Sequence, residues 1–545
     1  MNIKKLSLLF KLDFYIIVLI FSVIFVLFVR IRLLEIPLER DEGEYAYLGQ
    51  LICKGVPPYL TVANMKLPGV YLMYAFVFTL FGQSIIAVHL GLLCINFLAA
   101  FGIHRILKFL YKTPIAHLAT SVFLILTLSH TVLGFASHAT HFVIVFAIWG
   151  LYFFVTAKDK LFRYFLSGFF FALCILMKQH GVFLLFPLLT ILIPTPEKYS
   201  RIFIKIGTII LGFLIPFIFT FAWIYFYSNF NNFWFWTVEY AQHYASQVPI
   251  NLIPYALEQG INPVIKSYRW FWWVATAGFF YQLILIIRNR KAQIMILWTI
   301  GSMLSILPGF IFRPHYFITL LPAVAMLFAI TYQPINEWIM DKINYNFLKP
   351  ILYLLLIGYI AFIIERYSFY FIYRTPNEIS LISYSNQDIF PIKKQIADSL
   401  IKIANTTDTL AVFGSEPQLY FHTKLTTTVP LLYLYPLEEN HPYNFEMQNQ
   451  LIHKIETSKP KWIVDCAKGN YWKTDQTGNK KLLYEWFQEF ALKNYNLIGI
   501  YYRETKPLIP NIETLFEHPQ IVSNWNNPSL PTSRDYYIAI YKRKF

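Results

Sequence analysis

Residues 14–34 read FYIIVLIFSVIFVLFVRIRLL, and Arg30 and Arg32 are the only charged residues among these twenty-one. A helix needs about 20 predominantly apolar residues to cross the hydrocarbon core of a bilayer. The rest of the chain has the same character: of its 545 residues 57% are hydrophobic and 14% are charged, whereas a soluble globular chain carries about 25% charged residues. The sequence therefore predicts an integral membrane protein.

Eleven apolar runs, counting the first, are long enough to span a bilayer or nearly so. The other ten lie at 84–107, 114–133, 139–157, 163–178, 181–195, 202–228, 268–288, 292–311, 315–332 and 350–373. A shorter run at 68–82 follows Pro68 and predicts a helix at the membrane interface. The N-terminal segment MNIKKLSLLFK and the apolar run that follows lack a small-residue cleavage site, and the run is too long for a signal-peptide core. We therefore expect 14–34 to be an uncleaved first span.

Basic residues occupy alternate loops between these runs, and cytoplasmic loops are the ones enriched in Lys and Arg. The clusters are Lys4, Lys5 and Lys11; Arg105, Lys108 and Lys112; Lys158, Lys160 and Arg163; Lys198, Arg201 and Lys205; Arg288, Arg290 and Lys291; and Lys342 and Lys349. All fall on one side, so we expect a cytoplasmic N-terminus. An odd number of spans then places the C-terminal region on the other side.

The chain is therefore expected to contain a membrane domain, residues 1–374, with outer loops at 35–67 and 229–267, and an extracytoplasmic domain, residues 375–545. Seventeen of the 30 acidic residues fall in the second domain. Its pattern predicts a small α/β fold. We expect a helix at Ile392–Ala404 and strands at Thr409–Phe413, Lys461–Val464, Asn496–Tyr502 and Tyr536–Tyr541.

The formal net charge of +16 does not indicate nucleic-acid binding, because the basic residues lie between apolar runs and not on a water-exposed face. They read as topology signals and contacts to membrane lipids. The four cysteines are dispersed, two of them within apolar runs, and imply neither a disulfide framework nor a zinc cluster.

Carboxylates concentrate directly after the first span. Five of the 13 acidic residues in the first 375 positions lie between 35 and 44, and they include Asp41, Glu42 and Glu44. Carboxylates near a bilayer are costly unless solvated or paired, which favours a functional role, although a solvated loop at the headgroup surface is the alternative. Residues 40–55, RDEGEYAYLGQLICKG, place acids and residues such as Tyr45 at helical spacing, and predict an amphipathic helix on the membrane surface.

Two outer lysines are candidate anion ligands. Lys66 precedes the interfacial helix, and it could bind a lipid-linked phosphate or simply snorkel to the headgroups. Lys178, followed by Gln179 and His180, lies between two apolar runs on the outer side, where the positive-inside rule disfavours a lysine without a function.

Three further outer segments carry polar side chains. His138 and His141, three apart in one turn, could contact a sugar, bind a divalent cation or be interfacial residues. Glu239 and His243 lie four apart among aromatic residues of the kind that form membrane-interface belts. The third segment opens the tenth span with a guanidinium suited to a phosphodiester; it contains Arg313, His315 and Tyr316.

In this order along residues 10–330, these motifs resemble those of the GT-C superfamily of polyprenyl-phosphate-sugar-dependent glycosyltransferases. The similarity is to the branch with the protein O-mannosyltransferases, the lipid A aminoarabinose transferase and the RgtA-like sugar transferases. It is carried by Asp41-Glu42 with Tyr45, Lys66-Leu67-Pro68, Lys178-Gln179-His180-Gly181, Glu239 and Pro314-His315-Tyr316. The chain departs from the family pattern at Thr140, where the second outer loop usually has a carboxylate.

The C-terminal region adds a weaker similarity to RgtA-like relatives at Val412-Phe-Gly-Ser-Glu-Pro-Gln-Leu-Tyr420 and Pro460-Lys-Trp-Ile-Val464. The resemblance implies a polytopic all-α GT-C membrane domain with an α/β domain, in a bacterial inner membrane. It also implies a polyprenyl-phosphate sugar donor and a lipid, glycan or protein acceptor.

We expect Asp41 to be the general base, Glu42 or Glu44 to orient the acceptor, and Lys66, Lys178 and Arg313 to bind the leaving phosphate with His315 and Tyr316. Tyr45, His138, His141, Gln179, His180, Glu239 and His243 would line the substrate site. A single displacement implies inversion at the sugar C1. The alternatives are a secondary transporter or flippase for a lipid-linked sugar, and a non-catalytic membrane assembly or sensor protein.

Overall fold

The computed structural model describes residues 14–62, 64–193, 199–342, 351–384, 390–439, 441–466, 480–503 and 536–544. The basic residues Lys4, Lys5, Lys11, Lys198 and Lys349 lie outside this set. The chain divides into two compact units. The first contains residues 1–36, 66–226 and 240–379, and the second contains residues 37–65, 227–239 and 380–545.

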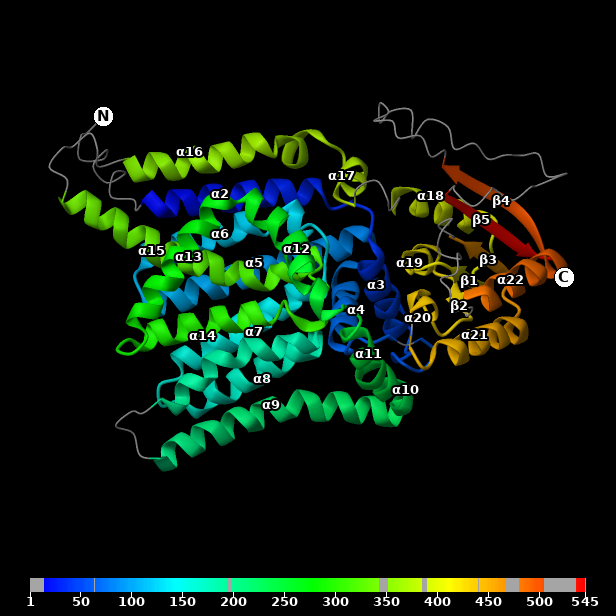
Figure 1. Ribbon diagram of the computed structural model, residues 1–545, viewed down its shortest axis with the longest axis horizontal. Helices are drawn as coiled ribbons and strands as arrows, with labels where there is room; N and C mark the ends of the chain where they lie inside the picture. Colours follow the sequence, from blue (N-terminus) through cyan, green and yellow to red (C-terminus); the bar gives the residue numbers. More distant parts are fainter. Residues whose placement is uncertain are drawn as a thin grey trace. The chain divides into compact units, whose positions relative to one another are not determined.

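The first unit is a bundle of apolar helices that lie side by side (Figure 1). Each of the eleven apolar runs in the sequence corresponds to a helical segment. These segments are α2 Phe14–Arg32, α5 Ile85–Leu110, α6 Thr113–Leu126, α7 Ala139–Thr156, α8 Leu161–Met177, η2 Gln179–Leu192, α9 Tyr199–Tyr227, α13 Arg269–Leu285, α14 Arg290–Leu304, α15 Leu321–Lys342 and α16 Ile351–Arg366.

Four helices of the described residues are long and apolar enough to cross a bilayer by themselves: Phe14–Arg32, Ile85–Leu110, Tyr199–Tyr227 and Pro314–Ile339. Several of the others are apolar but shorter, such as α8 with 17 residues. The shorter run at 68–82 forms helix α4, Gly69–Phe81, as expected. The region 229–267 also contains helices, namely α10 Phe230–Trp234, η3 Phe235–Tyr240, α11 Ala241–Ala245 and α12 Ile253–Ser267.

Helices α8 and α9 cross where neither has a side chain. A methyl group added at Gly168 of α8 would lie 1.9 Å from the carbonyl oxygen of Ile209. One added at Gly212 of α9 would lie 2.0 Å from the carbonyl oxygen of Phe165. Small residues allow such close backbone approach in membranes, where the hydrophobic effect does not hold helices together.

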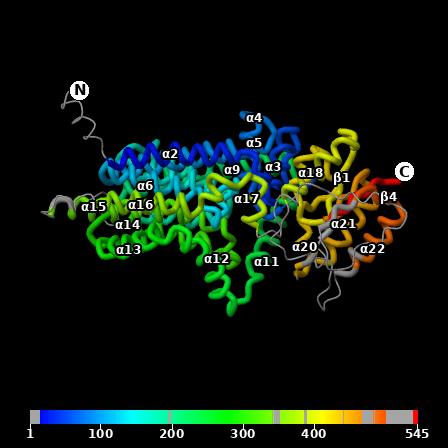
Figure 2. The backbone as a smooth tube through the Cα atoms, turned by 90° about the horizontal axis from the view of Figure 1, so that it is seen from above, coloured from blue at the N-terminus to red at the C-terminus, as the bar shows by residue number. Residues whose placement is uncertain are grey.

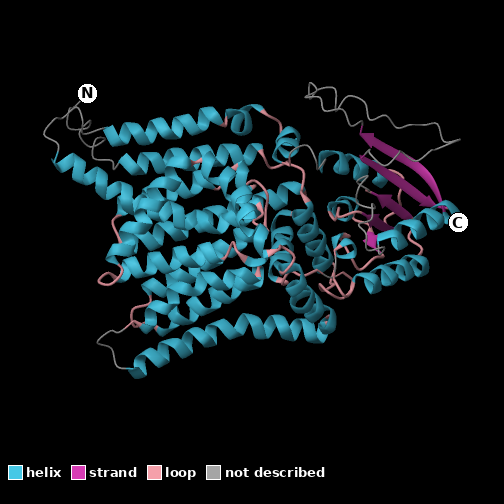
Figure 3. Cartoon of the chain, viewed as in Figure 1, coloured by secondary structure: helices cyan, strands magenta, loops and turns pink. Residues whose placement is uncertain are grey.

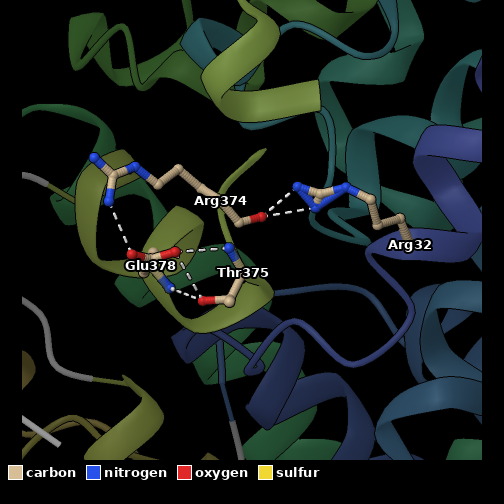
Figure 4. A network of polar contacts seen from close by, with 4 residues as sticks. All are labelled: Arg32, Arg374, Thr375 and Glu378. Atoms are coloured by element: carbon tan, nitrogen blue, oxygen red, sulfur yellow. Dashed lines mark hydrogen bonds and ion pairs between the residues drawn. The ribbon is translucent and has the colours of Figure 1, made fainter. Parts of the chain in front are cut away.

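The end of α2 is tied to the segment that follows α16 (Figure 4). Arg32 donates from Nη1 to the carbonyl oxygen of Arg374 at 2.7 Å and from Nε to that of Phe371 at 3.1 Å. Arg374 in turn pairs with Glu378 at 2.9 Å, and the same carboxylate accepts from the backbone N–H of Thr375 at 2.7 Å. The bonds from Arg32 satisfy carbonyl groups where the helical hydrogen-bond pattern stops.

The second unit contains the strands of the described chain (Figure 3). They are β1 Thr409–Phe413, β2 Thr426–Thr427, β3 Trp462–Asp465, β4 Tyr495–Arg503 and β5 Tyr536–Arg543, in the order β2-β1-β3-β5-β4. Strands β2, β1 and β3 are parallel, with Leu410 opposite Trp462, and β5 is antiparallel to both β3 and β4. All four predicted strands are present.

Five longer helices accompany this sheet: α3 Arg40–Cys53, α18 Phe390–Ile401, α19 Gln418–Thr423, α21 Asn444–Ser458 and α22 Lys480–Asn494. Phe487 of α22 packs on Phe413 of β1 with ring centroids 4.3 Å apart. In Figure 2 the strands and these helices, except the blue α3, belong to the yellow-to-red part of the chain. The predicted α/β character of the C-terminal region is confirmed.

Helix α3 forms where the sequence predicts it, but the expectation of one water-facing polar side is wrong. Every residue from Glu42 to Leu51 is buried, and the side chains of Glu42 and Glu44 are 1% and 0% exposed. Within its unit α3 packs on α19, where a methyl group added at Gly43 would lie 2.5 Å from the backbone nitrogen of Gln418. A contact that close leaves no room for solvent on that side of the helix.

Candidate functional site

In the first unit, the turn before α7 is fixed by side chains from two other helices. Buried Arg30 of α2 donates to the carbonyl oxygens of Thr127 at 2.9 Å and Gly134 at 2.7 Å. Tyr74 of α4 donates to the carbonyl oxygen of Ser137 at 2.7 Å. These bonds determine where His138, the N-cap of α7, is placed.

His138 lies against a histidine from a distant segment. Its ring stacks on that of His315, with centroids 4.0 Å apart and planes inclined by 16°. One nitrogen of each ring lies within 4.8 Å of the other. His141, in the first turn of α7, is 1% exposed. The stacked partner of His138 is thus His315, a pairing that the sequence did not predict.

The ammonium group of Lys178 is held over an aromatic ring. The Nζ of Lys178 lies 4.0 Å from the ring centroid of Tyr316, a cation–π geometry. Both Lys178 and Gln179 are half-buried. Tyr316 also lies 6.1 Å from the ring of His180 and 4.9 Å from that of His315. An ammonium, two imidazoles and a phenol therefore share one region of the first unit.

Ser305, the C-cap of α14, contributes its carbonyl oxygen and its hydroxyl to the contacts that hold this region together. Nδ1 of His180 lies 2.5 Å from the carbonyl oxygen of Ser305. The hydroxyl of Ser305 donates to Thr319 at 2.7 Å, and that of Thr319 donates to the carbonyl oxygen of Tyr316 at 2.9 Å. Ser305 thus connects the turn with Lys178 to η6, Pro314–Leu320, which carries His315 and Tyr316.

The segment before η6 has an unusual backbone. Gly309, Phe310 and Phe312 adopt φ values of 76°, 50° and 48°. A left-handed conformation at a non-glycine residue costs about 1–3 kcal/mol and persists only where its surroundings impose it. The next residue, Arg313, is exposed. The strained turn therefore leads directly into an exposed arginine, Arg313.

The segments with the two predicted phosphate-binding lysines touch each other. Lys66 is half-buried and precedes α4 by three residues. A methyl group added at Gly69, the first residue of α4, would lie 2.5 Å from the carbonyl oxygen of Leu176 and from Cε of Met177. Since Met177 adjoins Lys178, the fold brings the two lysine-bearing segments into contact. The anion-binding roles of the two lysines stay predictions.

In the second unit, α3 begins with a capping box. The Glu39 side chain accepts from the N–H of Glu42 at 2.9 Å, and the Glu42 side chain accepts from the N–H of Glu39 at 3.2 Å. Burial raises the pKa of Glu39 well above its ordinary value, and the charges of Asp41 and Glu42 raise it further. One of the Glu42 oxygens is therefore engaged in capping the helix.

Asp41 follows the cap and is half-buried. Its Oδ1 accepts a hydrogen bond from the hydroxyl of Tyr433 at 3.2 Å. Tyr45, one turn further along α3, is 1% exposed. Burial raises the pKa of Tyr59 well above its ordinary value, with a further contribution from the charge of Glu44. Nothing in the sequence near Tyr433 indicates that it reaches Asp41.

The remaining candidates lie in the region after α9. Glu239 is exposed, and His243 is half-buried. Glu239 belongs to η3, which has the wider π-helical winding. Within the second unit this region is tied to the end of the α3 loop, because Asn232 donates to the carbonyl oxygen of Tyr59 at 3.2 Å and Phe233 packs edge-on against the Tyr59 ring. The roles expected for Glu239 and His243 stay predictions.

Comparison with known proteins supports the fold. Residues 65–226 match the family model of dolichyl-phosphate-mannose-protein mannosyltransferases. A search of curated proteins finds no match. Among solved structures, the chain is similar to ArnT from Cupriavidus metallidurans bound to undecaprenyl phosphate, with 12% identity, 96% of this chain and 98% of that chain covered and a TM-score of 0.55.

The apo form of the same ArnT gives 11% identity, coverage of 96% and 97% and a TM-score of 0.56. The oligosaccharyltransferase of Archaeoglobus fulgidus is also similar, with 11% identity, coverage of 91% and 73% and a TM-score of 0.49. Two ArnT structures thus match over nearly the whole of both chains. This chain is an integral membrane protein with the fold of the GT-C glycosyltransferases, as its motifs predict.

Proposed function

We propose that the protein is a membrane glycosyltransferase that moves a sugar from a polyprenyl-phosphate carrier to a hydroxyl group of a lipid, glycan or protein acceptor. The observation that carries this proposal is the cationic and aromatic cluster of the first unit, formed by Lys178 over Tyr316 beside the stacked His138 and His315. Such a cluster suits a phosphate group, and one of the similar ArnT structures is bound to undecaprenyl phosphate.

In the proposed reaction the acceptor oxygen attacks C1 of the sugar. The C1–O bond to the acceptor forms while the bond from C1 to the phosphate oxygen breaks, and the polyprenyl phosphate leaves with the bonding electron pair. Asp41 takes the acceptor proton as general base. Lys66, Lys178 and Arg313 stabilise the negative charge of the leaving phosphate. A single displacement of this kind inverts the configuration at C1.

The roles of the other carboxylates follow from their surroundings. The capping contact of Glu42 favours Glu44 over Glu42 as the group that orients the acceptor. We further propose that the reaction takes place on the outer face of a bacterial inner membrane. In this orientation the N-terminus is cytoplasmic and residues 375–545 are extracytoplasmic. The distribution of Lys and Arg between the apolar runs supports this orientation.

The test is incubation of the purified protein in lipid with a panel of polyprenyl-phosphate sugars, measuring free polyprenyl phosphate and the glycosylated acceptor. Nucleotide sugars in the same assay test the other donor class. Movement of the lipid-linked sugar across the membrane without release of polyprenyl phosphate would instead identify a flippase. Release of polyprenyl phosphate that depends on the acceptor supports the transferase.

The base is tested by Asp41→Asn, which should lower turnover by roughly 100-fold or more, because a positioned general base contributes about that factor. Exposed Asp159, in the turn between α7 and α8, offers a matched control. Asp159→Asn should leave turnover unchanged. Near-normal transfer by a folded Asp41→Asn protein would refute the assignment of the base.

The phosphate site is tested by Lys66→Ala, which should chiefly raise KM for the donor, because the removed charge contacts the donor phosphate. Exposed Lys160 provides the control, and Lys160→Ala should leave the donor KM unchanged. A Lys66→Ala protein with an unchanged donor KM would show that the phosphate is bound elsewhere.

A further inference from the structure

In the second unit, the loop that follows β1 is hydrogen-bonded to Arg40, the first residue of α3. Arg40 donates from Nε to the carbonyl oxygen of Ser415 at 2.9 Å and from Nη2 to the carboxylate of Glu416 at 3.1 Å. The loop lies at the carboxyl end of a parallel strand, the edge of an α/β sheet where binding sites are usually built. Here the start of α3, a segment of the same chain, lies at that edge.

The acid in this loop is buried between two cations. Glu416 is 3% exposed, and it pairs with Lys393 of α18, which is 0% exposed, as well as with Arg40. Burial by itself would raise the pKa of Glu416, but the attraction of Arg40 and Lys393 outweighs burial and holds that pKa below its ordinary value. Such a buried set of charges holds Arg40, Glu416 and Lys393 together, because separating one of them would leave another buried charge without its partner.

Two further hydrogen bonds hold α3 along its length. The hydroxyl of Tyr47 accepts from the backbone N–H of Thr427 at 2.9 Å. The side-chain amide of Gln50 donates to the carbonyl oxygen of Phe421 at 3.2 Å. The helix that begins with Arg40 and Asp41 is thus bonded to the C-terminal region near its start, at Arg40, and further along, at Tyr47 and Gln50.

The same loop also places the partner of Asp41. The hydroxyl of Ser415 accepts from the N–H of Leu434 at 3.1 Å, and the preceding residue, Tyr433, donates its hydroxyl hydrogen bond to Asp41 Oδ1 at 3.2 Å. Ser415 is therefore bonded to the neighbour of each partner in this hydrogen bond. It contacts Arg40, which precedes Asp41, and Leu434, which follows Tyr433.

We propose that the C-terminal region is part of the catalytic apparatus, and that Tyr433 is a positioning residue that sets the orientation of the Asp41 carboxylate. This inference rests on the proposed role of Asp41 as the general base. A carboxylate on a short side chain can rotate about its terminal torsion, and a hydrogen bond to one oxygen restricts that rotation. The rate of proton transfer depends on how well the carboxylate is oriented, because small displacements of a reacting group slow the reaction strongly.

The test is a double-mutant cycle of Tyr433→Phe and Asp41→Asn, assayed for sugar transfer at saturating donor. Tyr433→Phe removes only the hydroxyl and should lower kcat about tenfold, the usual effect of losing a hydrogen bond to a charged group, with the donor KM unchanged. In the Asp41→Asn protein the further loss on adding Tyr433→Phe should be less than about twofold. A purely structural tyrosine would lower kcat by the same factor in both backgrounds.

Tyr495→Phe is the matched control, because Tyr495 is a buried tyrosine of the same unit whose hydroxyl donates to the carbonyl oxygen of Pro460 at 2.7 Å. It should leave kcat unchanged. Full activity of Tyr433→Phe together with a strongly impaired Asp41→Asn protein would overturn the positioning role and leave the proposed function intact. Full activity of Asp41→Asn would overturn both the base and its positioning. Equal losses from Tyr433→Phe in both backgrounds would also overturn the inference.

Discussion

The imidazole of His315 lies flat against that of His138, with the ring centroids 4.0 Å apart. Because each ring supports the other, we expect the pair to act as one unit. His138→Ala and His315→Ala should each lower kcat/KM for the donor about tenfold, and the double variant should be no more than slightly worse than either. Initial rates of polyprenyl phosphate release measure this effect.

A second stacked pair serves as the control for these variants. His104 and His117 of the same unit have ring centroids 5.3 Å apart and carry no proposed role in donor binding. His104→Ala should therefore leave kcat/KM unchanged. Effects of His138→Ala and His315→Ala that multiply would show that the two rings act independently.

Lys178 and Tyr316 give a prediction that separates charge from the aromatic ring. Lys178→Met should raise the donor KM about 10-fold to 100-fold, since it removes a charge that contacts phosphate. Tyr316→Phe keeps the ring face under the ammonium and should change KM less than Tyr316→Leu, which removes a cation–π contact worth about 0.5–2 kcal/mol. Steady-state kinetics with varied donor provide the measurement.

Another lysine over a tyrosine ring controls for a general loss of stability. Lys291 lies 5.2 Å from the ring centroid of Tyr111. Lys291→Met should leave the donor KM unchanged. If Tyr316→Phe and Tyr316→Leu raised KM equally, the ring face would have no part in holding Lys178.

The sequence predicted the helices and strands because their signals are local. Apolar runs of sufficient length predict helices in lipid, and the bounds of the run at Thr409–Phe413 coincide with those of strand β1. The N-cap of α3 was not predicted, since Glu39 is not among the residue types that usually cap helices. A glutamate there functions as a cap only together with Glu42.

The partners of the candidate site could not be predicted, because they come from segments far apart in the chain. His138 and His315 are brought together by the packing of α7 against η6. Tyr433 reaches Asp41 across 392 positions of sequence. The exposed face expected for α3 is absent, because every residue from Glu42 to Leu51 is buried. Part of that burial comes from α19 at Gly43, a contact that depends on tertiary structure and not on the period of the helix.

Glu39 predicts how stability changes with pH. Its pKa in the folded protein is raised above the ordinary value of 4.5 by burial and by its acidic neighbours. The folded state therefore binds more protons than the unfolded state above about pH 4.5, and the free energy of unfolding falls as pH rises, by up to about 1.4 kcal/mol per pH unit. The contribution is complete below pH 4.5 and is lost as pH passes the raised pKa.

Glu39→Gln should weaken this dependence, because glutamine keeps an oxygen that can accept from the Glu42 N–H but carries no charge. The melting temperature of the variant in detergent should exceed that of the wild-type protein more at pH 8 than at pH 5. Exposed Glu258 offers the control, and Glu258→Gln should shift melting equally at both pH values. A Glu39→Gln protein that melts below the wild type at pH 8 would contradict the prediction.

The crossing of α8 and α9 leads to a prediction about packing. Gly168→Ala would place a methyl group 1.9 Å from the carbonyl oxygen of Ile209, so the two backbones must separate. Overpacking of this kind costs about 1–3 kcal/mol, and the melting temperature should fall. Gly207→Ala is the control on α9, because a methyl group there meets no atom within 4 Å and should be neutral or slightly stabilising. Equal melting temperatures for Gly168→Ala and Gly207→Ala would mean that the helices do not cross at Gly168.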